Sequence, residues 1–225
     1  MRVWVTRAQP GAAATAARLR ARGFDPVVAP LLEVRPLPGG PIDLAGVAAV
    51  AFTSANGVAA FAGRSAVRDL PVFTVGAATA TAARAAGFVA VVSADGEVEA
   101  LAPVIAAHGP FIGAVLHPGP AEPAGDLVGS LAAMGLPARA LAVYETVVLA
   151  PRCRVAAEAV ILHSPKAARA LAAHLAAHPS PLLAAICLSP AVAAPLLGAG
   201  LASVQASLHP TENDLLALLV TGVAR

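Results

Sequence analysis

Hydroxyl and amide side chains recur at the points where apolar segments of this chain end. They are Thr6, Thr53, Ser54, Asn56, Thr74, Thr79, Ser164 and Ser189. When a strand ends in such a turn, the first N–H groups of the following helix point toward one position and attract an anion without help from Lys or Arg. Each hydroxyl alone suits a helix cap, but several at one sheet edge indicate a site for an anionic ligand.

The sequence lacks the motifs of several common catalytic sites. There is no GxGxxG after the first apolar segment, no GxxxxGK[ST] and no GxSxG, so dinucleotide, P-loop and serine-hydrolase chemistry are not indicated. His174 and His178 lie four residues apart on an expected helix, but without a third ligand they favour an ordinary helix face over a metal site. His117 and His163 each end an apolar segment and face the expected turns, where a structural role is favoured over a catalytic one.

Tyr144 is the one tyrosine of the chain and stands in the segment VYET. A phenol has a reference pKa of about 10, so it donates a hydrogen bond or a proton while remaining uncharged at neutral pH. From the residues alone, a packing role at a domain border and a catalytic role carry equal weight.

Six copies of one pattern position these residues: an apolar segment, a turn, and an Ala-rich segment typical of a helix. The opening segments of the six copies are residues 3–11, 49–61, 71–80, 114–120, 159–168 and 186–194. This alternation predicts an α/β fold with parallel sheets. Glycines followed by a hydrophobic residue mark the expected helix ends, at Gly23, Gly87, Gly135 and Gly200. Ser164-Pro165 and Ser189-Pro190 mark helix starts, and Pro195 predicts a kink or a short helix.

Two extended, proline-bounded segments interrupt this alternation, LLEVRPLP at 31–38 and YETVVLAP at 144–151. They predict a discontinuous first α/β domain of residues 1–31 and 151–225 and an inserted second α/β domain of residues 38–144. Residues 32–37 and 145–150 would be linker strands. Two such domains would form a cleft for a large polyanionic ligand. A single continuous sheet is the alternative.

The composition argues against several other classes of protein. Hydrophobic residues make up 58% and charged residues 12%, and the net charge is +2 without a basic patch, so no nucleic-acid partner is expected. Residues 179–208 contain no Asp, Glu, Lys or Arg, but prolines, glycines and serines interrupt this stretch, which argues against a membrane span. The N-terminus lacks a signal-peptide layout, so a cytoplasmic location is expected.

Several short motifs occur in a fixed order along nearly the whole chain. They are VTR (5–7), FTSANGV (52–58), VGAATA (75–80), MGLPARALAVYET (134–146), HSPKAARAL (163–171) and ICLSPAVA (186–193). In this order they resemble the uroporphyrinogen-III synthase family, whose fold is two parallel-sheet α/β domains joined by a two-stranded linker. The resemblance implies that Tyr144 is catalytic and that no cofactor or metal is needed. The substrate-binding residues expected from the matching motifs and turns are Thr6, Arg7, Thr53, Ser54, Asn56, Gly76, Thr79, His117, Ser164 and Ser189.

The resemblance implies that the chain cyclises hydroxymethylbilane, a linear tetrapyrrole with eight carboxylates, with loss of water and inversion of ring D. Loss of the ring A hydroxyl would give an azafulvene, which ring D attacks through its substituted carbon to form a spiro intermediate. Uncatalysed closure gives the unflipped type I isomer, so the enzyme would chiefly hold one conformer. A transient contact with hydroxymethylbilane synthase and a monomeric chain are further expectations.

Two departures from the family pattern leave alternatives open. His117-Pro118 stands where many members have Arg-Gly, and Ala191 and Val192 stand where threonines often occur. The chain could thus be an inactive homologue, or a non-catalytic binding protein for an anionic small molecule that uses the same turns. A nucleotide-dependent α/β transferase is disfavoured by the missing phosphate motifs. The isomer ratio of the product separates a synthase from a binding protein, and stabilisation by nucleotides would reveal a transferase.

Overall fold

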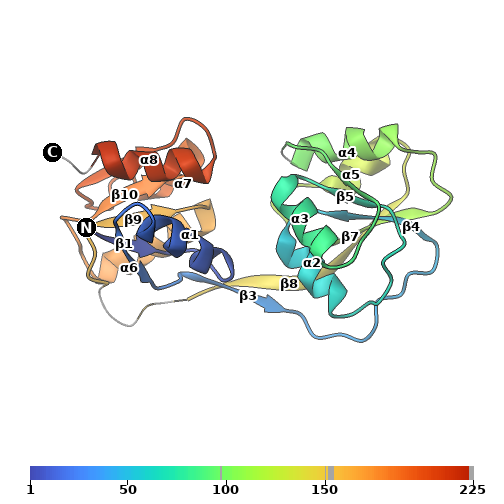
Figure 1. Ribbon diagram of the computed structural model, residues 1–225, viewed down its shortest axis with the longest axis horizontal. Helices are drawn as coiled ribbons and strands as arrows, with labels where there is room; N and C mark the ends of the chain where they lie inside the picture. Colours follow the sequence, from blue (N-terminus) through green and yellow to red (C-terminus); the bar gives the residue numbers. More distant parts are fainter. Residues whose placement is uncertain (97, 150, 152–154, 223–225) are drawn as a thin grey trace. The chain divides into compact units, whose positions relative to one another are not determined.

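The computed structural model describes residues 1–96, 98–149, 151 and 155–222, and the chain divides into two compact units (Figure 1). Unit 1 comprises Met1–Glu33 and Val147–Arg225, and unit 2 comprises Val34–Thr146. Each unit contains a sheet of mainly parallel strands with helices, which confirms the predicted α/β class. The expected linker segment 145–150 ends at a residue outside the described ranges. None of the described helices is long and apolar enough to cross a bilayer.

Unit 1 is built on a five-stranded sheet in the order β11-β10-β9-β1-β2, and each neighbouring pair is parallel. The strands are β1 (Arg2–Val5), β2 (Asp25–Val28), β9 (Ala159–Leu162), β10 (Ala184–Cys187) and β11 (Ser203–Ala206). The helices are α1 (Gly11–Arg20), α6 (Pro165–Ala177), α7 (Pro190–Ala193), the 3-10 turn η1 (Ala194–Leu196) and α8 (Glu212–Gly222).

Helices cover both faces of this sheet because successive strand residues point to opposite sides. Val3 and Val5 pack in one hydrophobic cluster with Leu19 of α1 and residues of α8. Trp4, between them in sequence, packs in a second cluster with Leu171 of α6 and residues of α7. α1 and α8 therefore share one face of the sheet, and α6 and α7 share the other.

Strands β1 and β9 form the topological switch point of unit 1. They are parallel neighbours, yet β1 continues into α1 on one face and β9 continues into α6 on the opposite face. In open α/β sheets, ligands bind outside the carboxyl ends of the strands at such a switch point. This rule makes the neighbourhood of residues 6–7 and 163–164, which follow the two strands, the expected ligand position in unit 1.

Unit 2 is built on a six-stranded sheet in the order β3-β8-β7-β4-β5-β6. The strands are β3 (Leu32–Pro36), β4 (Val47–Phe52), β5 (Val72–Thr74), β6 (Val91–Ser93), β7 (Ala114–Pro120) and β8 (Ala138–Val148). The helices are α2 (Ala55–Ala62), α3 (Ala77–Ala85), α4 (Val98–Ala107) and α5 (Leu127–Ala133). Neighbours from β8 to β6 are parallel. β3 runs antiparallel to β8, since the Leu37 N–H donates to Val143 O at 2.9 Å and the Leu149 N–H donates to Leu31 O at 2.8 Å.

Strands β4 and β7 form the switch point of unit 2. Val50 and Phe52 of β4 pack in a cluster with residues of α2 and α3, whereas Ala49 and Ala51 pack with residues of α4 and α5. β4 continues into α2 on the first face, and β7 leads to α5 on the second. The carboxyl ends of β4 and β7 are therefore the expected ligand position in this unit.

Local signals in the sequence predict most chain reversals correctly. Gly23, Gly87 and Gly135 have φ of +80°, +97° and +75°, so these predicted helix ends are confirmed. The prediction of a short helix at Pro195 is also confirmed, because α7 ends before Pro195 and the chain continues as η1. The prediction of a turn after His117, in the copy that opens at 114–120, is wrong, because β7 continues through His117 and Pro118 to Pro120. Its parallel pairing with β8, which extends as far as Tyr144, keeps this segment extended.

Candidate functional site

Ser54 and Tyr144 meet at the carboxyl-terminal edge of the unit 2 sheet. Ser54 is the N-cap of α2, and its Oγ accepts a hydrogen bond from the Gly57 N–H at 3.2 Å. The same Oγ lies 2.8 Å from the Tyr144 hydroxyl. Because β7 lies between β4 and β8 in the sheet, the contact reaches across the intervening strand. Two residues that the sequence marks separately thus form one hydrogen-bonded pair.

The surroundings of Tyr144 keep its hydroxyl protonated. The residue is 6% exposed and belongs to the hydrophobic cluster of Val50, Phe52 and Leu116. Burial raises the pKa of the phenol, and the hydrogen bond from Ser54 partly opposes that rise. At neutral pH Tyr144 is therefore an uncharged hydrogen-bond donor, and its hydroxyl has the chemistry needed to donate a proton to a leaving group.

His117, on β7, is buried, and one hydrogen bond defines its tautomer. Its Nδ1 lies 2.9 Å from the carbonyl oxygen of Ala51, and since a carbonyl can only accept, Nδ1 carries the proton. Burial lowers the pKa of the ring more than the bond to Ala51 raises it, so the ring is neutral and Nε2 is an acceptor. A Cβ on residue 119 would lie 2.7 Å from Nε2, so a larger residue than Gly119 would collide with the His117 ring.

The start of α2 is pressed closely against the end of β7. A Cβ built on Gly57 would lie 2.7 Å from the carbonyl oxygen of Pro118, a distance that a real side chain does not tolerate. Thr53 and Asn56, the neighbouring residues of the motif, are partly exposed. The first turn of α2 and the end of β7 therefore form a rigid, close-packed edge beside Ser54.

The remaining unit 2 candidates lie at the start of α3, which follows the adjacent strand β5. Gly76 is the N-cap of α3, and its carbonyl oxygen accepts from the Ala80 N–H at 3.0 Å. Gly76 has no side chain with which to cap this helix start, so the first N–H groups of α3 receive no hydrogen bond from their cap residue. Thr79 is 8% exposed and packs within α3. Of the two residues, Gly76 is the more exposed.

In unit 1 the structure separates the roles of two neighbouring residues, Thr6 and Arg7. The Thr6 hydroxyl is fully buried and donates to Ile161 O at 2.8 Å, joining β1 to β9. The Arg7 side chain is 34% exposed, and its Nη1 lies 3.0 Å from Oε2 of Glu212 at the start of α8. The sequence offers no signal for this pairing, because 205 residues separate the partners.

Two further helix starts in unit 1 carry the predicted serines. Ser164 caps α6, and its Oγ accepts from the Ala167 N–H at 3.2 Å. Ser189 is the N-cap of α7, but no hydrogen bond from its side chain caps this four-residue helix. His163, just before Ser164, has a pKa lowered to about 4, first by burial and then by Arg7.

The other polar candidates do not form a metal site. The rings of His174 and His178 stack at a centroid distance of 4.6 Å, and His174 also packs edge-on against Trp4. Among residues 1–96, 98–149, 151 and 155–222, no group of three or more His, Cys, Asp and Glu side chains could hold a metal ion. Cys187 is fully buried, and burial raises the pKa of its thiol to about 12, so it is an unreactive core residue.

The fold and the two sheet edges define a class: a two-unit α/β protein with hydroxyl side chains and helix starts at its switch points and a buried tyrosine at that of unit 2. A family model described as "Uroporphyrinogen-III synthase HemD" matches residues 13–217. The chain therefore belongs to the uroporphyrinogen-III synthase family, and its function is that of a synthase in tetrapyrrole biosynthesis. It is an enzyme, a cyclising lyase, and its substrate is hydroxymethylbilane.

Two solved structures show the same fold. Uroporphyrinogen-III synthetase from Helicobacter pylori is 18% identical with a TM-score of 0.66, and the match covers 98% of each chain. A mutant uroporphyrinogen III synthase from the extremely thermophilic bacterium Thermus thermophilus is also 18% identical, with a TM-score of 0.56 and coverage of 98% of this chain and 97% of that one. A search of curated protein sequences finds no match.

Proposed function

We propose that Tyr144 assists the departure of the ring A hydroxyl of hydroxymethylbilane, so that the chain acts as a cyclising hydro-lyase. The observation that carries this proposal is the 2.8 Å contact between the Tyr144 hydroxyl and Ser54 Oγ at the unit 2 switch point. When the carbon–oxygen bond breaks, the Tyr144 O–H donates to the departing oxygen, which leaves as water. Ring A loses its pyrrole N–H proton as it becomes an azafulvene, and this proton balances the one given by Tyr144, so that the phenol is restored.

Three hydrogen-bond donors would form a chain that ends at the departing oxygen. The Gly57 N–H donates to Ser54 Oγ at 3.2 Å, the Ser54 O–H can donate to the Tyr144 oxygen, and the Tyr144 O–H is then free to donate to the substrate. Each bond strengthens the next, because a donor becomes more acidic when its oxygen accepts a hydrogen bond. The start of α2 adds the positive end of the helix dipole to this chain of bonds.

Substrate carboxylates would be held largely by backbone N–H groups at the helix starts. The N-caps Ser54, Gly76, Ser164 and Ser189 all follow parallel strands at the carboxyl-terminal edges of their sheets. Helix N-termini attract anions without free cations, which suits a chain with a net charge of only +2. Fixing several carboxylates at once selects one conformer of the linear substrate, and orientation is the main requirement for flipping ring D.

The remaining parts of the proposal concern the setting of the reaction. We expect the chain to work as a monomer in the cytoplasm, without a cofactor, and to receive its unstable substrate through a transient contact with hydroxymethylbilane synthase. Support comes from the lability of the substrate, which closes unaided to the type I isomer.

A coupled assay tests the proposed reaction. Porphobilinogen and a deaminase are incubated with and without this chain, and the products are oxidised and separated as uroporphyrin isomers. A shift from type I to type III is the expected result. Type I in both samples, with folded protein and fresh substrate, would contradict the synthase activity and favour a binding protein.

A further inference from the structure

One carboxylate in unit 1 holds two guanidinium groups. Oε2 of Glu212 lies 3.0 Å from Nη1 of Arg7 and 3.1 Å from Nη1 of Arg18. Its other oxygen, Oε1, accepts a hydrogen bond from the Thr15 hydroxyl, and Arg7 Nη1 also lies 3.3 Å from that hydroxyl. The cluster thus joins α1 to the first turn of α8, and within it two positive charges face one negative charge.

A neutral histidine borders this cluster. Nε2 of His163 lies 3.9 Å from Oε1 of Glu212, and neither ring nitrogen has a hydrogen-bond partner within the described residues. Burial and the Arg7 charge lower the pKa of His163 to about 4, against the opposing effect of Glu212. His163 is therefore uncharged near neutral pH, and the excess charge of the cluster stays on the guanidinium groups.

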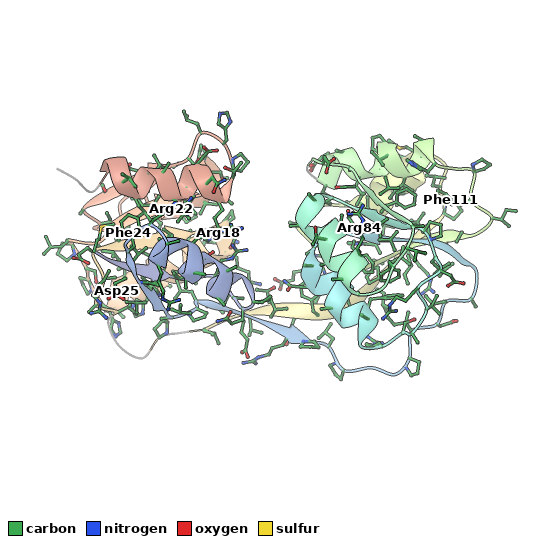
Figure 2. The ribbon with its side chains drawn as sticks, viewed as in Figure 1. Arg18, Arg22, Phe24, Asp25, Arg84 and Phe111 are labelled. Carbon is green, nitrogen blue, oxygen red and sulfur yellow. The ribbon has the colours of Figure 1, made fainter. Side chains whose placement is uncertain are left out.

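The guanidinium groups are the accessible part of the cluster. The side chains of Arg7 and Arg18 are 34% and 52% exposed, whereas that of Glu212 is 16% exposed. Figure 2 shows Arg18 and Arg22 near the seam between α1 and α8, and Arg22 lies 3.4 Å from Asn213, the residue after Glu212. The seam therefore presents positive charge outward and keeps its carboxylate on the inner side.

The cluster also lies at the unit 1 switch point. Arg7 follows β1 and His163 follows β9, the two parallel neighbours whose helices leave on opposite faces. A Cβ on Gly11 would lie 2.5 Å from Nε of Arg7, so the Arg7 side chain lies directly across the start of α1. Position, charge and exposure thus coincide at the place where α/β sheets bind ligands.

We infer that Arg7 and Arg18 form a binding site for a carboxylate group of the tetrapyrrole, and that Glu212 is the resident counter-ion that positions both guanidinium groups. The inference rests on the proposed function, because the ligand is an acetate or propionate side chain of the substrate or product. Glu212 holds the two donors in place before binding, which lowers the entropy lost when the ligand carboxylate arrives. It also weakens the field that this carboxylate meets. Replacing Glu212 by glutamine would remove the negative charge but keep the side-chain length and one acceptor oxygen to hold the donors, so this variant should bind the ligand more tightly.

Titration with uroporphyrin III, the oxidised octacarboxylate product, tests this site directly. The chain's one tryptophan, Trp4, is in β1 of the same unit and is 1% exposed, so quenching of its emission reports binding. Arg18→Gln is compared with Arg20→Gln, which makes the same change of charge on an exposed residue of the same helix. We expect Arg18→Gln to raise Kd about fivefold at low salt, as for one partly exposed charge pair, and Arg20→Gln to leave it within about twofold. Arg18→Lys retains the charge and should bind within about twofold of the unaltered chain.

Glu212→Gln separates a ligand site from a purely structural ion cluster. We expect it to lower Kd about fivefold at low salt, and the difference to shrink at high salt, because the variant removes a competing negative charge. Equal Kd values for Arg18→Gln and Arg20→Gln, or weaker binding by Glu212→Gln, would overturn the inference. A failure of the unaltered chain to produce type III isomer in the coupled assay would instead refute the proposed function, whatever the titration shows.

Discussion

Replacing Tyr144 by phenylalanine removes the proposed donor and leaves most of the packing in place. The aromatic ring would stay in its cluster with Val50, Phe52 and Leu116. The change breaks one hydrogen bond, the 2.8 Å contact with Ser54 Oγ, and Ser54 keeps its bond from the Gly57 N–H. A typical net loss for one such bond is about 1 kcal/mol, so the variant should fold with Tm lowered by roughly 4 °C.

The expected loss of activity is larger than the loss of stability. A hydrogen bond to a group that develops charge contributes about 1.5–3 kcal/mol, which corresponds to about a 10- to 150-fold decrease in kcat. KM should change little, because the hydroxyl contributes mainly in the transition state. As the enzymatic reaction slows, unaided closure competes better and the share of type I isomer rises.

The assay uses freshly generated hydroxymethylbilane and measures both kcat and the isomer ratio. Because burial raises the pKa of Tyr144 above about 10, ionisation of this phenol should not reduce kcat of the unaltered enzyme below that pH. If Tyr144→Phe retained kcat within twofold and formed the same share of type III isomer, the donor role would be refuted.

Ser54→Ala provides the matched control, since it keeps the tyrosine and removes the group that supports it. It also removes the N-cap of α2, at a cost of about 1 kcal/mol of stability. Loss of the Ser54 bond removes the influence that lowers the pKa of Tyr144, so the phenol becomes a weaker acid. We expect a decrease in kcat smaller than that of Tyr144→Phe, and an equal or larger decrease would assign the chemistry to Ser54.

Three further predictions concern the two sheet edges. Gly57→Ala should destabilise the protein by about 2 kcal/mol in urea unfolding, because its Cβ would lie 2.7 Å from Pro118 O. Gly76→Ala is the control: its Cβ would have nothing within 4 Å, so the free energy of unfolding should change little. Thr6→Val should cost about 1–2 kcal/mol in the same measurement, since the buried Ile161 carbonyl loses the donor that lies 2.8 Å away, and an unchanged midpoint would contradict that role. The pKa of His163 is lowered from 6.5 to about 4 on folding, so the unfolded chain binds the proton more tightly. This residue should therefore reduce stability by about 3 kcal/mol as the pH falls through that interval. His163→Gln should remove this part of the pH dependence of Tm.

Local physical chemistry accounts for what could be predicted residue by residue. Ser54 and Ser164 were recognisable as helix caps because a cap depends on residues three positions apart. The ends at Gly23 and Gly87 were recognisable because a left-handed residue there favours glycine. The extension of β7 through His117 was not, since it depends on pairing with β8.

The sequence by itself determined the α/β class and the helix starts, because each follows from side-chain type and short spacing, and it identified Tyr144 as a side chain that can donate a hydrogen bond while uncharged. Tertiary structure decided which of these groups meet. The contact between Tyr144 and Ser54 depends on the order β8-β7-β4, and the pairing of Arg7 with Glu212 depends on α1 and α8 sharing one face of a sheet. Strand order and helix placement follow from burial of the whole core rather than from any local signal, so contacts over 90 and 205 residues had no signature in the sequence.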